Sequence, residues 1–123
     1  MGDGEFRIAA QIGAKGYYGK VALKAEPAEN NGIIRVDFDA TNANRWNCGA
    51  AFGIEYVLEH ISQRKLFPSG GRVFVSAIEG HEVDTNNTVI AYVTAIALLE
   101  ALGIEPTRRP SFNQDAGIFE FPK

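Results

Sequence analysis

The chain has 123 residues, of which 46% are hydrophobic and 22% are charged, and its formal net charge is −3. This length suits one domain with one core, and the composition is ordinary for a globular protein. The acidic balance disfavours broad, sequence-independent binding to phosphate backbones, so we expect no DNA partner, although it leaves room for a local basic patch. A single cysteine, Cys48, excludes an internal disulfide and a cysteine-rich zinc site and favours a reducing compartment.

The N-terminal segment MGDGEFRIAA lacks the basic stretch and apolar run of a signal peptide. No segment approaches the roughly twenty apolar residues that a membrane span needs. We therefore expect a soluble, cytoplasmic protein with no membrane partner.

The first half of the chain is predicted to form three strands. Residues Phe6–Ile12 read as a strand that the turn sequence GAKG closes, and Tyr18–Ala25 reads as the next. After the loop EPAENNG, the segment Ile33–Ala40 alternates between apolar and polar residues, which is typical of a half-buried strand with one face in water. The apolar side carries Ile34, Val36 and Phe38, and the polar side carries Arg35, Asp37 and Asp39.

The pattern then changes to helical spacing. A first helix is indicated by the apolar positions Ala50, Ile54, Val57, Leu58 and Ile61. Either Asn44 or Asn47 is expected to cap its start, and Pro68 with Gly70-Gly71 to end the unit.

A fourth strand, Arg72–Ile78, precedes a second helix whose apolar side carries Val89, Tyr92, Val93, Ile96 and Leu99. We expect Asp84 or Thr85 to cap the start of this helix and Gly103 to cap its end. The tail sequence GIFEFP is a candidate final strand. The order β-β-β-α-β-α predicts an α+β fold in which the helices cover one face of a mixed sheet.

Three local motifs in this order resemble domain IV of the translation factor elongation factor G, which has the fold of the second domain of ribosomal protein S-five. They are the entry motif KGYYGKV at Lys15–Val21, the pair Gly53-Ile54 in the first helix, and His81-Glu82-Val83-Asp84 in the loop before the second helix. The similarity runs from about Lys15 to about Gly103. The resemblance implies that the connection from the third strand through the first helix to the fourth strand is a left-handed crossover, whereas general physics favours right-handed ones.

The sequence departs from the family pattern at two points. The chain lacks a phosphate-binding loop of the type G-x-x-x-x-G-K-[ST]. It also has Thr85-Asn86-Asn87 where the family has a pair of serines. The resemblance therefore implies that this chain shares the fold of the family, but not that it carries out translocation alone.

The candidate binding residues are His81, Glu82, Asp84, Arg45 and Arg72. In the family, the tip loop enters the decoding region of the ribosome, close to transfer and messenger RNA. An imidazole suits that place because it can stack on a base and donate a hydrogen bond to a phosphate or ribose. The alternative is that His81 is only an exposed loop residue beside a helix cap.

We expect no metal, no cofactor and no catalytic residue, although enzymatic activity stays an open alternative. His81, Glu82 and Asp84 form a thin ligand set without a further histidine nearby. Cys48 is expected to be a small buried residue rather than a nucleophile.

Two functions remain open. One is a non-catalytic domain that recognises structured RNA or a ribosomal surface through the loop at residues 80–87. The other is a protein-interaction or self-assembly domain that kept the fold without RNA binding. Because Phe119 and Phe121 share one side of the tail, we also expect the tail to dock on its own chain or on a second copy in a homodimer.

Overall fold

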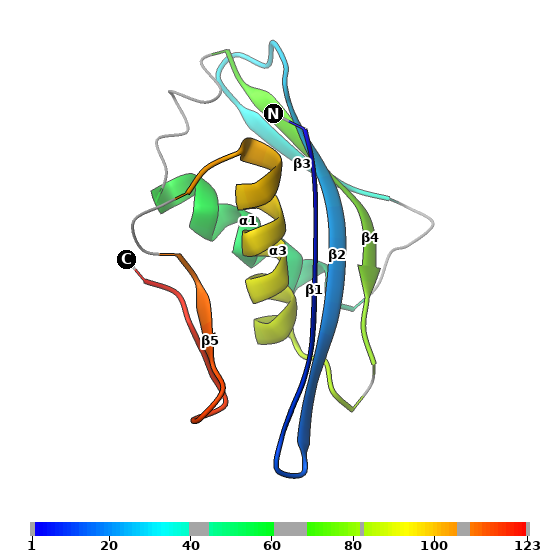
Figure 1. Ribbon diagram of the computed structural model, residues 1–123. Coiled ribbons are helices and arrows are strands. Elements are labelled where there is room, and N and C mark those ends of the chain that lie inside the picture. Colours follow the sequence, from blue (N-terminus) through cyan, green and yellow to red (C-terminus); the bar gives the residue numbers. More distant parts are fainter. Residues whose placement is uncertain (1, 40–44, 61–68, 82, 106–108, 123) are drawn as a thin grey trace.

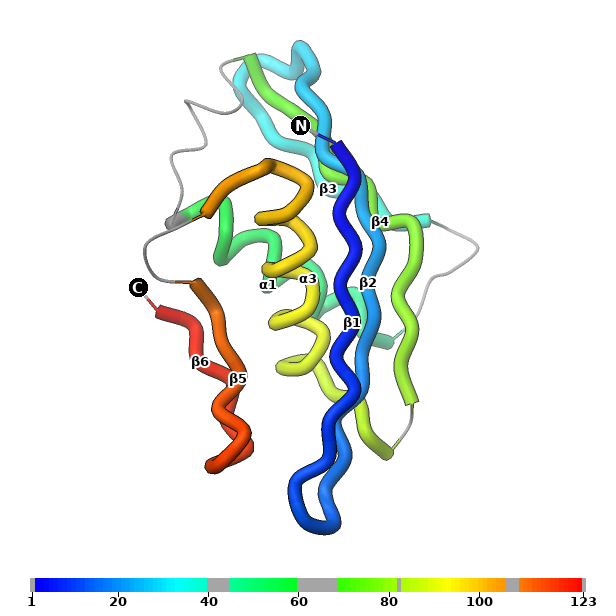
Figure 2. Tube along the Cα trace, viewed as in Figure 1, coloured from blue at the N-terminus to red at the C-terminus, as the bar shows by residue number. Residues whose placement is uncertain are grey.

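The computed structural model describes residues 2–39, 45–60, 69–81, 83–105 and 109–122. A four-stranded sheet in the order β1-β2-β4-β3 is covered on one face by two helices, and a separate two-stranded sheet lies beyond them (Figures 1 and 2). In chain order the elements are β1 (Asp3–Ile12), β2 (Lys15–Pro27), β3 (Ile34–Phe38), α1 (Asn47–His60), β4 (Gly71–Glu79), α3 (Asn87–Leu102), β5 (Ser111–Asn113) and β6 (Ile118–Glu120). The predicted α+β class, with a mixed sheet and helices on one face, is confirmed.

The sheet is mixed because β1, β2 and β4 pair antiparallel, whereas β3 pairs parallel to β4. Along β2, Val21, Leu23 and Ala25 are buried against the helices, while Lys24 between them is exposed. This alternation is the expected pattern of a sheet with one face on the core and one in water.

The connection from β3 through α1 to β4 is left-handed. In Figure 1, β1 is nearest the viewer, and β2, β4 and β3 lie progressively further away. The chain descends β3, crosses to the helix layer, climbs through α1 and returns down β4, one strand nearer the viewer. A turn that is clockwise to the viewer while it advances toward the viewer is left-handed, as the resemblance implied and against the general preference.

Helix α3 lies at the centre of the fold, and thirteen of its sixteen residues are buried. Glycines allow its neighbours to come close: a Cβ built at Gly53 of α1 would lie 2.4 Å from the Ala91 carbonyl oxygen, and one at Gly4 of β1 would lie 1.9 Å from the Ala97 carbonyl oxygen. The backbones of α1 and β1 therefore pack directly onto α3.

The C-terminal tail forms the hairpin β5–β6, in which Phe112 faces Phe119. The Phe119 ring lies 5.0 Å from the Tyr92 ring of α3, and the Phe121 ring lies 5.3 Å from the Tyr56 ring of α1. The Tyr56 hydroxyl donates a hydrogen bond to the Pro122 carbonyl. The tail therefore docks on its own chain, which is the first of the two predicted outcomes, and it is a hairpin rather than one strand.

The predicted N-cap of α3 was wrong. The cap of α3 is Asn86, whose Oδ1 accepts a hydrogen bond from the Val89 N–H at 2.9 Å, and not Asp84 or Thr85. In α1, Asn47 is the first helical residue rather than the cap, and Asn44 lies outside the described residues. The predicted C-cap is confirmed, because Gly103 has a φ of 68° and its N–H bonds to the last turn of α3.

Candidate recognition surface at the 80–85 loop

The loop from β4 to α3 lies at the lower end of the sheet in Figure 1, beside β2. Three hydrogen bonds hold it. The Tyr18 N–H donates to the Asp84 carbonyl at 2.9 Å, the Thr85 hydroxyl donates to the Tyr18 carbonyl at 2.7 Å, and the His81 N–H donates to Thr85 Oγ1 at 2.7 Å. Thr85 is buried, so the two bonds that its hydroxyl makes are shielded from water. The loop is thus attached to the sheet, and Thr85 has a different role from the predicted cap.

His81 is exposed and stacks on Tyr18. The two ring centroids are 4.0 Å apart, and the ring planes differ by 3°. The Arg7 guanidinium carbon lies 5.7 Å from the centroid of the Tyr18 ring. The imidazole is therefore supported on one face by an aromatic ring and presented to solvent, which is an arrangement suited to a further stacking partner.

Arg45 belongs to the same end of the protein. A Cβ built at Gly80 would lie 2.8 Å from the Trp46 ring, so that indole packs against the start of the loop. The Arg45 guanidinium carbon lies 4.9 Å from the centroid of the Trp46 ring. The structure thus links Arg45 to the start of the loop through the Trp46 ring.

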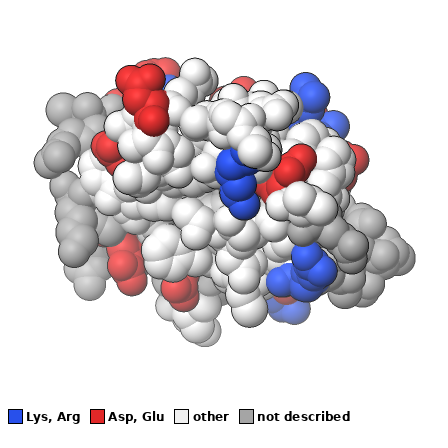
Figure 3. All heavy atoms as spheres, turned by 90° about the horizontal axis from the view of Figure 1, so that it is seen from below, with Lys and Arg blue, Asp and Glu red and all other residues white. Residues whose placement is uncertain are grey.

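Asp84 lies against the first residues of β2. A Cβ at Gly16 would lie 2.7 Å from Asp84 Oδ1, so the glycine makes room for this carboxylate. The neighbouring Lys15 places its ammonium nitrogen 5.9 Å from the centroid of the Tyr17 ring. Basic and acidic side chains are interspersed on this end of the molecule, which Figure 3 views from below. Among the described residues the surface is neither uniformly positive nor uniformly acidic.

Arg72 does not join this group. It is the second residue of β4, whereas His81 follows the other end of that nine-residue strand, and such a strand spans roughly 25 Å. Arg72 Nε donates to Asp37 Oδ2 at 2.9 Å, and Arg35 Nε donates to Asp37 Oδ1 at 3.1 Å. These two hydrogen bonds, from Arg72 first and Arg35 second, lower the pKa of Asp37. Glu82, the remaining candidate, lies outside the described residues.

No cluster of three or more histidine, cysteine, aspartate or glutamate side chains suited to a metal ion occurs within the described ranges. No helix in the part of the chain that the structure describes has the length and apolar character to cross a membrane.

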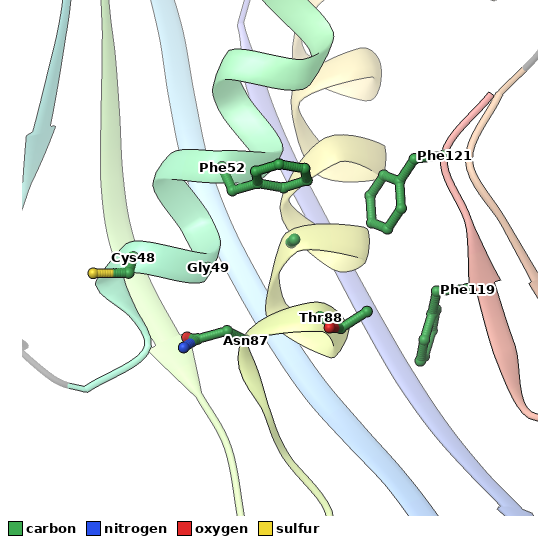
Figure 4. Close-up of a pocket in the computed structure, with 8 residues that line it drawn as sticks. Cys48, Gly49, Phe52, Asn87, Thr88, Phe119 and Phe121 are labelled. Carbon is green, nitrogen blue, oxygen red and sulfur yellow. The ribbon is translucent and has the colours of Figure 1, made fainter. Parts of the chain in front are cut away.

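A groove that the sequence did not indicate lies between α1, α3 and the tail (Figure 4). It encloses about 470 Å³, and its walls are largely apolar. Its lining is Cys48, Gly49, Phe52, Asn87, Thr88, Ala91, Phe119 and Phe121. Cys48 is exposed here, so its expected burial was wrong. The tail pattern did show two phenylalanines on one side, but not which surface of the chain they meet.

No protein-family profile matches the chain, and no curated protein sequence matches it. The fold is similar to the crystal structure of a protein from Thermus thermophilus, with a TM-score of 0.66 and 22% sequence identity. The similarity covers 83% of this chain and 16% of that one, so the chain spans about a sixth of the length of the solved structure. At this identity the comparison shows the fold alone.

Proposed function

We propose that this protein is a non-catalytic recognition domain that binds structured RNA or an RNA-bearing ribosomal surface through its 80–87 loop. The observation that carries the proposal is the exposed His81 ring, stacked at 4.0 Å on Tyr18 in a loop attached to the sheet. An unstacked base in an RNA loop or bulge can lie on such a ring, and single-stranded RNA elements are recognised largely by stacking.

The charges near His81 support a local rather than an extended contact with phosphate. Arg7 lies over Tyr18, Arg45 lies over Trp46, and Lys15 is at the adjacent turn. Asp84 lies among them, and the whole chain is acidic. We therefore expect few phosphate contacts and a shallow dependence of affinity on salt, since each neutralised phosphate of a single strand contributes about 0.7 to the slope of log K against log salt.

The resemblance to domain IV of elongation factor G supports the same proposal. The left-handed crossover agrees with the fold that the resemblance implied, and His81 and Asp84 occur in the tip loop as its motif expects. The fold by itself does not imply the function, so the proposal depends on the loop.

The test compares His81→Ala with the unchanged chain in co-sedimentation with ribosomal subunits and in fluorescence binding to a labelled RNA stem-loop. The stability of the variant should change by no more than about 0.5 kcal/mol, as for other surface substitutions, while RNA binding weakens. Arg72→Ala is the matched control, because Arg72 is a charged candidate at the other end of β4 and should leave binding unchanged. Equal affinity of His81→Ala and the unchanged chain would refute the proposal.

A second candidate function, protein interaction or self-assembly, is favoured by the net charge of −3 and by the acidic groups interspersed at the loop. It predicts no RNA-dependent sedimentation at any salt concentration. The same co-sedimentation experiment therefore separates the two functions.

A further inference from the structure

The strand β1 is a long open edge of the sheet. Its ten residues pair with β2 without interruption from Asp3, opposite Lys24, to Ile12, opposite Lys15. No described segment pairs with its other side, and Figures 1 and 2 show β1 along the uncovered front edge of the sheet. An edge of this kind presents a row of unpaired N–H and C=O groups on which another strand can form.

The usual protection of an edge is largely missing here. β1 contains no proline, and its pairing with β2 shows no bulge. The opposite edge of the sheet, β3, is only five residues long. Charges on β1 therefore decide which strand can pair with it, and Glu5 and Arg7 are exposed on the same outer face, two residues apart.

We propose that β1 pairs antiparallel with β1 of a second copy of this chain, in the register that places Phe6 opposite the partner's Phe6. In this register Glu5 lies opposite the partner's Arg7, and Arg7 lies opposite the partner's Glu5. Both symmetry-related pairs join opposite charges, and directly opposed cross-strand pairs of opposite charge stabilise a sheet.

Neighbouring registers are worse. If the twofold axis moves by one residue toward the N-terminus, Arg7 faces the partner's Asp3, but Glu5 faces the partner's Glu5. If it moves by one residue the other way, Arg7 faces the partner's Arg7 and Glu5 has no charged partner. If the pairing slips by a single residue, apolar side chains of one copy oppose polar side chains of the other. Among these registers, the one centred on Phe6 joins opposite charges without placing like charges opposite each other.

The inner face fits the same arrangement. Phe6 is half-buried and packs edge-on against Tyr92, with ring centroids 5.9 Å apart. The proposed axis brings the two Phe6 side chains together, and aromatic cross-strand pairs add to sheet stability. The two four-stranded sheets then join into one eight-stranded sheet, with α1 and α3 of both copies on one side. This closed twofold contact is the commonest form of homo-oligomer.

The experiment measures mass against concentration by sedimentation equilibrium. The unchanged chain should show a monomer–dimer equilibrium. Glu5→Arg and Arg7→Glu each create two like-charge pairs, so each variant alone should dimerise about 30-fold more weakly. Lys24→Glu is the matched control, because it reverses an exposed charge on β2, one strand in from the edge, and should leave the dimer unchanged.

The decisive sample is an equimolar mixture of the two variants. The Glu5→Arg chain offers two arginines and the Arg7→Glu chain offers two glutamates. The mixture should therefore form a heterodimer about as tight as the dimer of the unchanged chain, and tighter than the homodimer of either variant. Recovery in the mixture also shows that each variant is folded. A monomeric unchanged chain, a dimer insensitive to either reversal, or no recovery in the mixture would each overturn the proposal. Because the measurement is mass rather than RNA binding, its outcome is independent of the proposed function.

Discussion

Replacing Thr85 by Val should destabilise the protein more than its small change in shape suggests. The Thr85 hydroxyl donates to the Tyr18 carbonyl and accepts from the His81 N–H, both at 2.7 Å. Valine keeps the volume and loses both bonds. Each is worth about 1 kcal/mol net, and the shielded groups left without partners add to the cost, so we expect a loss of about 2–3 kcal/mol.

The matched control is Thr85→Ser, which keeps the hydroxyl and removes one buried methyl group. That change should cost about 1 kcal/mol. The two substitutions therefore separate hydrogen bonding from packing, because packing alone would make serine the worse replacement.

Urea unfolding measures both free energies, with the change read from the midpoint at constant slope. Hydrogen exchange gives a second readout, because the His81 amide should exchange faster in Thr85→Val than in Thr85→Ser. If serine destabilises the protein as much as valine, or the His81 amide is unaffected, the hydrogen bonds do not hold the loop.

Four other outcomes are expected. Asn86→Ala should cost about 1 kcal/mol in urea unfolding, because it removes the cap of α3, whereas Asp84→Ala should stay within about 0.5 kcal/mol. Gly53→Ala should destabilise by about 1–3 kcal/mol in the same assay, because its methyl group would meet the backbone of α3. The pKa of Asp37 is lower in the folded than in the unfolded protein, so its ionised carboxylate stabilises the fold above about pH 4. This stabilisation is lost as the pH falls through the folded pKa, and the stability of Asp37→Asn should lack this acid dependence in unfolding curves. A chain that ends at Pro110 should melt at a lower temperature in a calorimetric scan, because the rings of the tail no longer cover α1 and α3.

Local periodicity was sufficient to predict the strands β1 to β4 and the helices α1 and α3, but not the order in which the strands pair. The alternation around Val21 and the helical spacing of Ile54 and Val57 depend on residues within one element, and each proved buried as expected. The handedness of the crossover from β3 through α1 to β4 could not be predicted in this way. Periodicity carries no information on handedness, and the general rule favours a right-handed crossover. Only the resemblance predicted that the crossover is left-handed.

The candidate site was predicted less completely, since its contacts join distant segments. The sequence located the loop, and the structure links Arg45 to it through Trp46. Nothing in the spacing of the residues showed that the Tyr18 ring would support His81. The cap was assigned to the wrong residue for a similar reason. Thr85 has a suitable side chain, yet its hydroxyl is already bonded to β2, and Asn86 caps the helix instead. A choice between adjacent capping residues depends on tertiary contacts that a local pattern does not contain.

The burial of nearly every residue of α3 explains why the tail belongs to this fold. Periodicity singled out one apolar stripe on this helix, but its sequence NTVIAYVTAIALLEAL is apolar on nearly every side. A helix of that kind needs cover all round. The sheet covers one side and α1 another, and the Phe119 ring covers Tyr92 on a third. The two phenylalanines that suggested a dimer contact are therefore used within the chain, and among the described strands the long unpaired surface is β1. Self-association, if it follows the physics of open edges, should then depend on the charges of β1 rather than on the tail.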